Sequence, residues 1–406
     1  MKYILRLLPI AIAFFSMPSC TKTDNGAPAA AMDSVTIGGL FSLTGNWSTL
    51  GVNSSAALQI AVQDINSYLA DRGVNFRIAY KIYDTKLDPA TAVTATDKAI
   101  AEKNIKYYIG PQSSAELAAL KDKVASNGLL MISQGSTASA LATPDDAIFR
   151  FCPGDKVEGK AIAQTLWANN KTYVITIARD DAGNKGLQAS VGSFSQTMGA
   201  MVDAVTPYAS NTTDFSALIS TLKTKIQTNT SSLGASHVAV YLASFDEAKD
   251  LFHQASTDAT LASVDWYGGD GVVLSNVLTS DSLAADFAMR THFFAPNFGV
   301  PSNTNPDHDR IYNAIKTSSG LEPDAYALSV YDAAWVLART LSSYPKARTD
   351  LSVLKTTFVS EADKYYGISG PVMLDANGDR AVGSFDYYGI KKTGSIFTWN
   401  FVGRSE

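Results

Sequence analysis

The spacing of apolar residues changes from strand-like to helical within the opening segment after residue 33. Val35-Thr36-Ile37 is a β-branched run, followed by a loop of glycine and hydroxyl residues through Gly38-Gly39, 42–45 and Trp47. Apolar residues then recur at helical spacing at Ala57, Leu58, Ala61, Val62 and Ile65. This pattern predicts a strand, a loop and a long amphipathic helix. A small anion is well held at such a point, because backbone N–H groups, hydroxyls and a positive helix end meet there.

Strand-like and helical runs keep alternating along the rest of the chain. The predicted elements of the first series span residues 76–83, 89–101, 107–109, 114–125 and 129–132. Those of the second series span residues 160–168, 173–178, 186–198, 202–205, 215–226, 237–241, 248–255 and 264–267. Asp88-Pro89 is a good helix start, with an N-cap acceptor followed by a proline. The alternation predicts an α/β fold with two doubly wound parallel-sheet lobes.

Three segments are predicted to carry the chain between the lobes and so form a hinge. They are Pro153-Gly154, the aromatic run 292–296, and the segment from Gly370-Pro371 to Gly378-Asp379. Helices after Pro306 and over 325–341 then return to the first lobe, and strands at 384–388 and 397–401 follow. The expected first lobe is 34–152 plus 295–371, and the expected second lobe is 153–294 plus 372–406.

The N-terminus has the pattern of an export signal. Lys2 and Arg6 precede an apolar run over 7–15, which is too short to span a membrane, and Cys20 follows a small residue. We expect a signal peptide over 1–19, and a lipidated Cys20 with a flexible spacer over 20–33. The alternative is ordinary signal cleavage with an incidental Cys20. Either reading predicts an exported protein of the periplasm or cell envelope, and lipidation would anchor it to the membrane.

Composition narrows the remaining possibilities. The chain is 46% hydrophobic and 17% charged, and 406 residues are enough for two domains. Loss of Lys2 and Arg6 with the signal takes the formal charge from −5 to −7, and no basic stripe suggests nucleic acid. Cys152 is the only cysteine after Cys20, which excludes an intramolecular disulfide in the mature domain. We expect Cys152 to be a packed residue.

Four motifs occur in order along the chain: Ile37-Gly38-Gly39 through Thr44-Gly45, Tyr83-Asp84 with Asp88-Pro89, Ile109-Gly110-Pro111 with Ser113-Ser114, and Gly370-Pro371 with Asp375 and Gly378-Asp379. Together they resemble the type I periplasmic solute-binding proteins, especially the leucine/isoleucine/valine-binding group that serves ATP-driven importers. The resemblance covers about 34–402. It implies a monomeric protein that captures a small amino acid or related zwitterion without a cofactor and delivers it to a membrane permease.

The resemblance also implies where the ligand's carboxylate is held. The family uses a serine after the Gly-Pro loop and a threonine-containing loop one strand later, which correspond here to Ser113, Ser114, Gly135, Ser136 and Thr137. The chemistry suits that role, because a carboxylate taken from water needs several fixed donors. The alternative is that these hydroxyls only cap their own backbone.

The family's acidic partner for the ligand's ammonium group corresponds to Asp270, in a glycine-flanked segment after a predicted strand. A charge-assisted hydrogen bond would join the two; the alternative is a turn-forming Asp-Gly pair. Where the group has pocket tyrosines, this chain has Gly183 within 180–184, and either Ser244 or Phe245. These losses favour a larger or more polar ligand.

Trp47 and Tyr326 match first-lobe aromatic positions that cover the ligand's side chain, although plain core packing is the alternative.

Catalysis is not expected. His237, His253, His292 and His308 are scattered without metal-ligand spacing, and segment 375–379 lacks the later glutamate of a calcium loop. The open alternatives to transport are a ligand-sensing lipoprotein, a lipoprotein that activates an envelope enzyme, and a binder of a non-amine organic acid.

Overall fold

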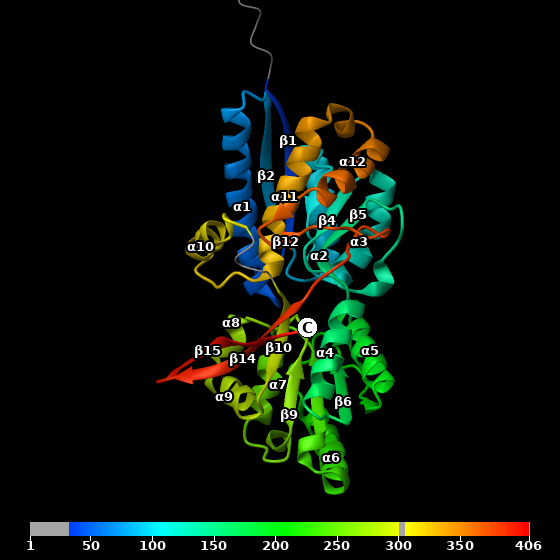
Figure 1. Cartoon of the computed structure of the whole chain (residues 1–406), viewed down its shortest axis with the longest axis vertical. Helices are drawn as coiled ribbons and strands as arrows, with labels where there is room; N and C mark the ends of the chain where they lie inside the picture. The colour runs from blue at the N-terminus through cyan, green and yellow to red at the C-terminus, as the bar shows by residue number, and fades with distance from the viewer. Residues whose placement is uncertain (1–31, 300–304, 406) are drawn as a thin grey trace, which may run out of the picture.

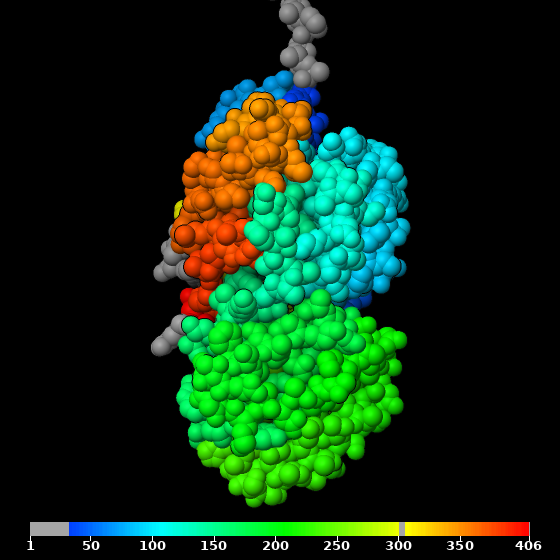
Figure 2. Space-filling model, turned by 90° about the vertical axis from the view of Figure 1, so that its right-hand side faces the viewer, coloured from blue at the N-terminus to red at the C-terminus, as the bar shows by residue number. Residues whose placement is uncertain are grey.

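Two sheets, each covered by helices, build two lobes stacked end to end in the computed structural model, which describes residues 32–299 and 305–405 (Figure 1). The upper lobe contains the first part of the chain and the lower lobe its middle part. In Figure 2 the lower lobe, coloured green, meets the upper lobe along a visible boundary. The predicted α/β fold with two parallel-sheet lobes is confirmed.

All strand pairs of the first sheet are parallel among the described residues. Its order is β13 (Asp379–Arg380), β5 (Ile148–Pro153), β4 (Leu130–Ser133), β3 (Tyr107–Ile109), β1 (Asp33–Phe41) and β2 (Phe76–Asp84). Its helices are α1 (Ser48–Asp71), α2 (Pro89–Lys103), α3 (Ser114–Asn127), α10 (His308–Ser319), α11 (Ala325–Ser343) and α12 (Leu351–Asp363). β1 runs through the predicted Gly38-Gly39 loop to Phe41, because β2 pairs with it along that whole length.

The second sheet is parallel except at one edge, where β10, β14 and β15 pair antiparallel. Its order is β15 (Ile396–Arg404), β14 (Phe385–Thr393), β10 (Phe294–Phe298), β9 (Asp265–Gly268), β8 (Val238–Ala243), β6 (Tyr173–Ala178) and β7 (Met201–Ala204). Its helices are α4 (Asp155–Ala168), α5 (Ala182–Thr197), α6 (Ser216–Leu233), α7 (Ala248–Ala255), α8 (Asn276–Ser280) and α9 (Ser282–Arg290). A small separate ladder joins β11 (Tyr366–Gly367) and β12 (Gly370–Pro371).

The chain passes between the lobes after β5, after β10 and after β13. Two of these crossings differ from the predicted boundaries. β10 pairs with β9 and β14, so residues 295–298 belong with the second sheet rather than the first. β13 pairs with β5, so 372–380 lie with the first lobe rather than the second. The aromatic run and the Gly-Pro segment therefore lie inside the lobes, close to the crossings.

Local sequence explains where the helices start. Asp88 caps α2 as predicted, with its side chain accepting from the Thr91 N–H, and Pro89 is the first helical residue. Ser113 and Glu116 form a capping box at α3. α8, α9 and α12 were not predicted, although Asp281 and Asp350 cap α9 and α12.

Each lobe has its own apolar core. α1 and α11 pack together over the first sheet, burying residues such as Ile65 and Leu337, and α7 and α9 pack over the second sheet around Trp266. Within the described part of the chain, no helix combines the length and apolar character needed to cross a membrane. The predicted signal peptide, Cys20 and most of the spacer lie outside the described residues.

Candidate functional site

A small cavity lies where the two lobes meet at the ends of their strands. It is lined by Trp47, Ser113, Ser114, Gly135 and Thr137 from the first lobe, and by Gly183, Asn184, Leu187, Phe245 and Asp270 from the second. Its volume is about 10 Å³, which is close to the space that one water molecule needs. The lobes are therefore closed onto each other at this point.

The Ser114 hydroxyl is arranged to donate into the cavity. Ser114 is the first residue of α3, so the positive end of that helix faces the same space. Its Oγ accepts from the Ala138 N–H at 3.1 Å and from the Ser136 hydroxyl at 3.1 Å. Because both contacts use Oγ as acceptor, the Ser114 proton is left to bind an acceptor such as a carboxylate.

The neighbouring first-lobe residues Ser113, Gly135 and Ser136 mainly support the local structure around Ser114. The Ser113 hydroxyl donates to Glu116 Oε2 at 2.6 Å, which matches the capping alternative. A side chain at Gly135 would lie 2.7 Å from the Gln112 carbonyl oxygen and 3.1 Å from the Trp47 ring, so only glycine lets the loop pass there. Ser136 is fully buried and reaches the cavity through Ser114.

Asp270 stands on the second-lobe side, directly after β9. Its Oδ2 accepts from the Tyr326 hydroxyl at 2.8 Å, a hydrogen bond that joins the lobes, and its N–H donates to Glu158 Oε1 at 3.0 Å. Burial raises the pKa of Asp270 to about 6, against the Tyr326 hydrogen bond that lowers it. Burial raises the pKa of Glu158 well above its usual value.

A cluster of aromatic rings closes the cavity on one side. We call Trp47, Phe245, Phe298 and Tyr326 the aromatic cluster. The rings of Trp47 and Phe245 lie 4.9 Å apart across the lobes, and Tyr326 packs edge-on against Trp47 at 6.1 Å and Phe298 at 4.9 Å. Trp47 adopts a left-handed backbone (φ 56°) at the start of α1, an uncommon conformation for a large residue. Trp47 and Tyr326 thus lie at the site, with Tyr326 fully buried.

Buried carboxylates give the lobe boundary a negative character. Burial raises the pKa of Asp155 and of Asp324 to about 7, and that of Asp246 to about 6. Thr137 lowers the pKa of the adjacent Asp155, since its hydroxyl lies beside the carboxyl. Arg179 is paired with other acids, at 3.2 Å from Asp181 and 3.4 Å from Glu247. The region favours a positively charged group near Asp270.

The structure changes the second-lobe assignments in detail. Gly183 lies opposite Ser114, and a side chain there would approach the Ser114 hydroxyl to 3.3 Å. Ser244 is fully buried and does not line the cavity; Phe245, the other candidate, does. Asn184 and Leu187 were not predicted. Both lie on the first turns of α5. The side chain of Asp181, in the acidic loop before that helix, caps it by accepting from the Asn184 N–H, so this loop was the sequence feature that could have located both residues.

Metal binding finds no support in residues 32–299 and 305–405, where no group of His, Cys, Asp and Glu is placed to hold an ion. The histidines stay apart: His253 and His292 bond to Asp281 and Asp265 near the surface. Cys152 is buried, as predicted. To a ligand, the residues around the cavity offer hydrogen-bonding groups, carboxylate charge and an aromatic wall.

Residues 53–393 match the family described as the receptor family ligand binding region. The chain belongs to this family. An uncharacterized protein of Methanocaldococcus jannaschii is 27% identical over 385 residues, covering 91% of this chain and 89% of that protein. The Leu/Ile/Val-binding protein BraC3 of Rhizobium johnstonii is 27% identical over 370 residues, covering 89% of this chain and 93% of that protein. The crystal structure of a leucine binding protein LivK from Thermotoga maritima superposes with a TM-score of 0.74 at 21% identity, covering 92% of this chain and 99% of that one.

This member of the ligand-binding family therefore has the type I periplasmic binding protein fold that the four motifs indicated. Its relatives named for a function are binding proteins rather than enzymes, and they support a solute-binding role.

Proposed function

We propose that this protein is an exported solute-binding lipoprotein that captures an amino acid or related small zwitterion between its lobes and presents it to the permease of an ATP-driven importer. The observation that carries the proposal is the opposition of Ser114 and Asp270 across one enclosed cavity. Ser114 at the start of α3 offers a donor for a carboxylate, and Asp270 offers an acceptor for an ammonium group. A zwitterion is the small ligand that matches both halves.

Ligand entry requires the lobes to separate, because the cavity of about 10 Å³ is too small for an amino acid. The contacts to be broken include the Tyr326–Asp270 hydrogen bond, the Trp47–Phe245 ring contact, and the bond from Thr49 Oγ1 to Asn276 Oδ1 at 2.6 Å. A ligand that neutralises Asp270 and binds Ser114 together would favour a closed form in which the lobes enclose it. That form would present a defined surface to the importer.

Isothermal titration calorimetry tests the proposal. The mature protein is unfolded and refolded to remove any copurified solute, then titrated with each common amino acid and with the corresponding 2-hydroxy acids. We expect heat with at least one amino acid and none with its hydroxy analogue, since only the amine pairs with Asp270. Binding of hydroxy acids alone would mean that the ligand is a plain organic acid rather than a zwitterion. Absence of heat with every compound would refute solute capture of this class and favour a sensing or enzyme-activating lipoprotein.

A further inference from the structure

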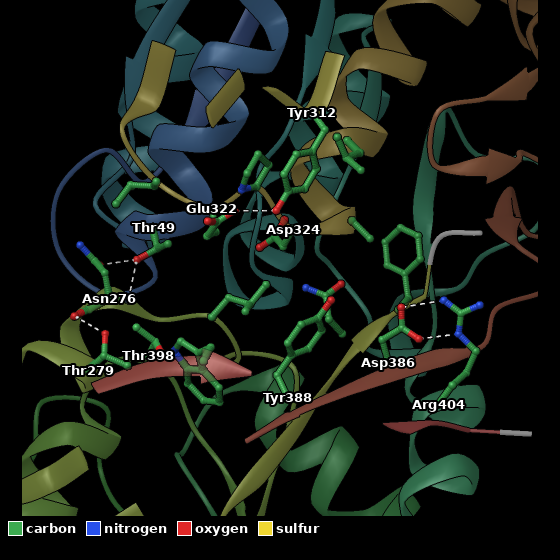
Figure 3. A pocket seen from close by; sticks show the side chains of 18 of the residues that line it. Thr49, Asn276, Thr279, Tyr312, Glu322, Asp324, Asp386, Tyr388, Thr398 and Arg404 are labelled. Atoms are coloured by element: carbon green, nitrogen blue, oxygen red, sulfur yellow. Dashed lines mark hydrogen bonds and ion pairs between the residues drawn. The ribbon is translucent and has the colours of Figure 1, made fainter. Parts of the chain in front are cut away.

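A second and much larger cavity, of about 520 Å³, lies between the lobes on the other side of the aromatic cluster. Phe298 of that cluster lines it, whereas Trp47 and Phe245 line the small cavity. Both lobes contribute walls: in Figure 3, Tyr312 and Asp324 from the first lobe face Tyr388 from the second. The volume falls within the range of small-molecule pockets.

An unsatisfied amide marks this cavity. Asn297 lies on β10 and lines the cavity, and its side chain is only 3% exposed. The amide nitrogen and the amide oxygen are both buried without a hydrogen-bond partner. Buried polar groups in folded proteins are normally paired, and leaving them unpaired is unfavourable. A ligand that offers one donor and one acceptor side by side would satisfy both atoms.

The other lining residues restrict the shape and charge of that ligand. The rings of Phe298, Tyr312, Tyr388 and Trp399 give the cavity flat apolar faces on which an aromatic group can stack.

Charge on the walls disfavours anions. Arg404 is paired with Asp386, and Glu322 is paired with Lys316, so these charges largely cancel. Asp324 lines the same cavity and caps α11 through the Ala327 N–H, and no cation among the described residues forms an ion pair with it. Burial raises the pKa of Asp324 to about 7, so part of this carboxyl is ionised at neutral pH, and that negative charge would repel a carboxylate.

We propose that this cavity is a second ligand site, distinct from the one at Asp270, for a neutral or cationic aromatic molecule that carries a donor beside an acceptor, the chemistry of an aromatic amide. Asn297 recognises the amide edge and Tyr388 with its neighbouring rings holds the aromatic face. Because the walls come from both lobes, an occupant stabilises lobe closure. By linkage it then raises the affinity of the first site for its own ligand. The existence of the second site does not depend on the amino-acid function proposed above.

Calorimetry on the mature protein, with benzamide and nicotinamide as probes and benzoate as a matched anion, tests this site. We expect the two amides to bind and benzoate to bind at least tenfold more weakly. Asn297→Leu keeps the side-chain size and removes the amide, so it should weaken benzamide at least tenfold. Asp270→Asn is the matched control and should leave benzamide binding unchanged, even where it abolishes amino-acid binding.

A second variant, Thr398→Trp, tests the same cavity independently in case the Asn297→Leu protein does not fold. Thr398 is exposed on β15 and borders the cavity (Figure 3), so an indole there fills the space without disturbing a core. It should also abolish benzamide binding. The proposal is overturned if neither amide binds the unmodified protein, if benzoate binds as well as benzamide, or if benzamide binding survives both cavity variants. Loss of benzamide binding in Asp270→Asn would assign the probe to the first site and equally overturn a second one.

Discussion

Replacing Asp270 with asparagine should weaken ligand binding and, at neutral pH, raise the stability of the protein without added ligand. Asp270 is only 7% exposed and accepts from the Tyr326 hydroxyl at 2.8 Å. Asparagine has the same shape and its amide oxygen can still accept that hydrogen bond. The substitution therefore removes the charge and leaves the contact that joins the lobes.

Binding should become much weaker. An ammonium group enclosed beside residue 270 would lose its charged partner, and breaking a buried charge pair in this way costs about 2–5 kcal/mol. Since about 1.4 kcal/mol is a factor of ten, the dissociation constant should rise by roughly 30-fold to several thousandfold.

Stability of the protein without added ligand should instead increase at neutral pH. The folded pKa of Asp270 is raised from 3.8 to about 6, mainly by burial. A raised folded pKa means that stability is highest at low pH and is lost as the pH rises from about 4 to 6. The difference of about two pKa units corresponds to a cost on the order of 3 kcal/mol above pH 6. Asparagine does not ionise, so the variant avoids that cost.

Two measurements on the same preparations check this reasoning. Calorimetry gives the amino-acid dissociation constant, and urea unfolding monitored by circular dichroism gives the free energy of unfolding at pH 4 and pH 7.5. The variant should gain stability relative to the unmodified protein at pH 7.5 and little at pH 4. An unchanged dissociation constant would place Asp270 outside the binding site. A variant that is less stable at pH 7.5 would show that the buried carboxylate stabilises the fold.

Three further predictions follow from individual contacts. Amino-acid affinity should fall by about tenfold per pH unit below about pH 6, because Asp270 becomes protonated there; a flat profile from pH 7.5 to 5 in calorimetry would contradict this. Ser114→Ala should weaken binding by about 10- to 100-fold through loss of a hydrogen bond to a carboxylate, while Ser113→Ala, whose hydroxyl serves Glu116, should change the dissociation constant much less. Arg150→Ala should lower the free energy of unfolding by about 3–5 kcal/mol in urea, because it leaves the buried Asp379 unpaired; a change below about 1 kcal/mol would refute that role.

The sequence by itself determined most of the helices and strands, and its resemblance to a known family indicated the general position of the site. Strand and helix periods are local properties, so β6 and α7 were predicted at their observed bounds of 173–178 and 248–255. Local capping chemistry likewise fixed the start of α2 at Asp88-Pro89. The resemblance to the solute-binding family indicated Ser114, Thr137 and Asp270, and all three line the small cavity.

Tertiary structure alone decided which lobe the short crossing segments join and which side chains reach the site. β13 is two residues long and carries no period of its own, so only its pairing with β5 assigns it to the first sheet. Neighbouring residues at a strand end point in opposite directions, so the choice between Ser244 and Phe245 depends on packing against Trp47. The larger cavity joins residues as distant in sequence as Thr49 and Arg404, and no local pattern encodes that proximity. Packing between residues far apart in the sequence, rather than local secondary-structure propensity, sets these features.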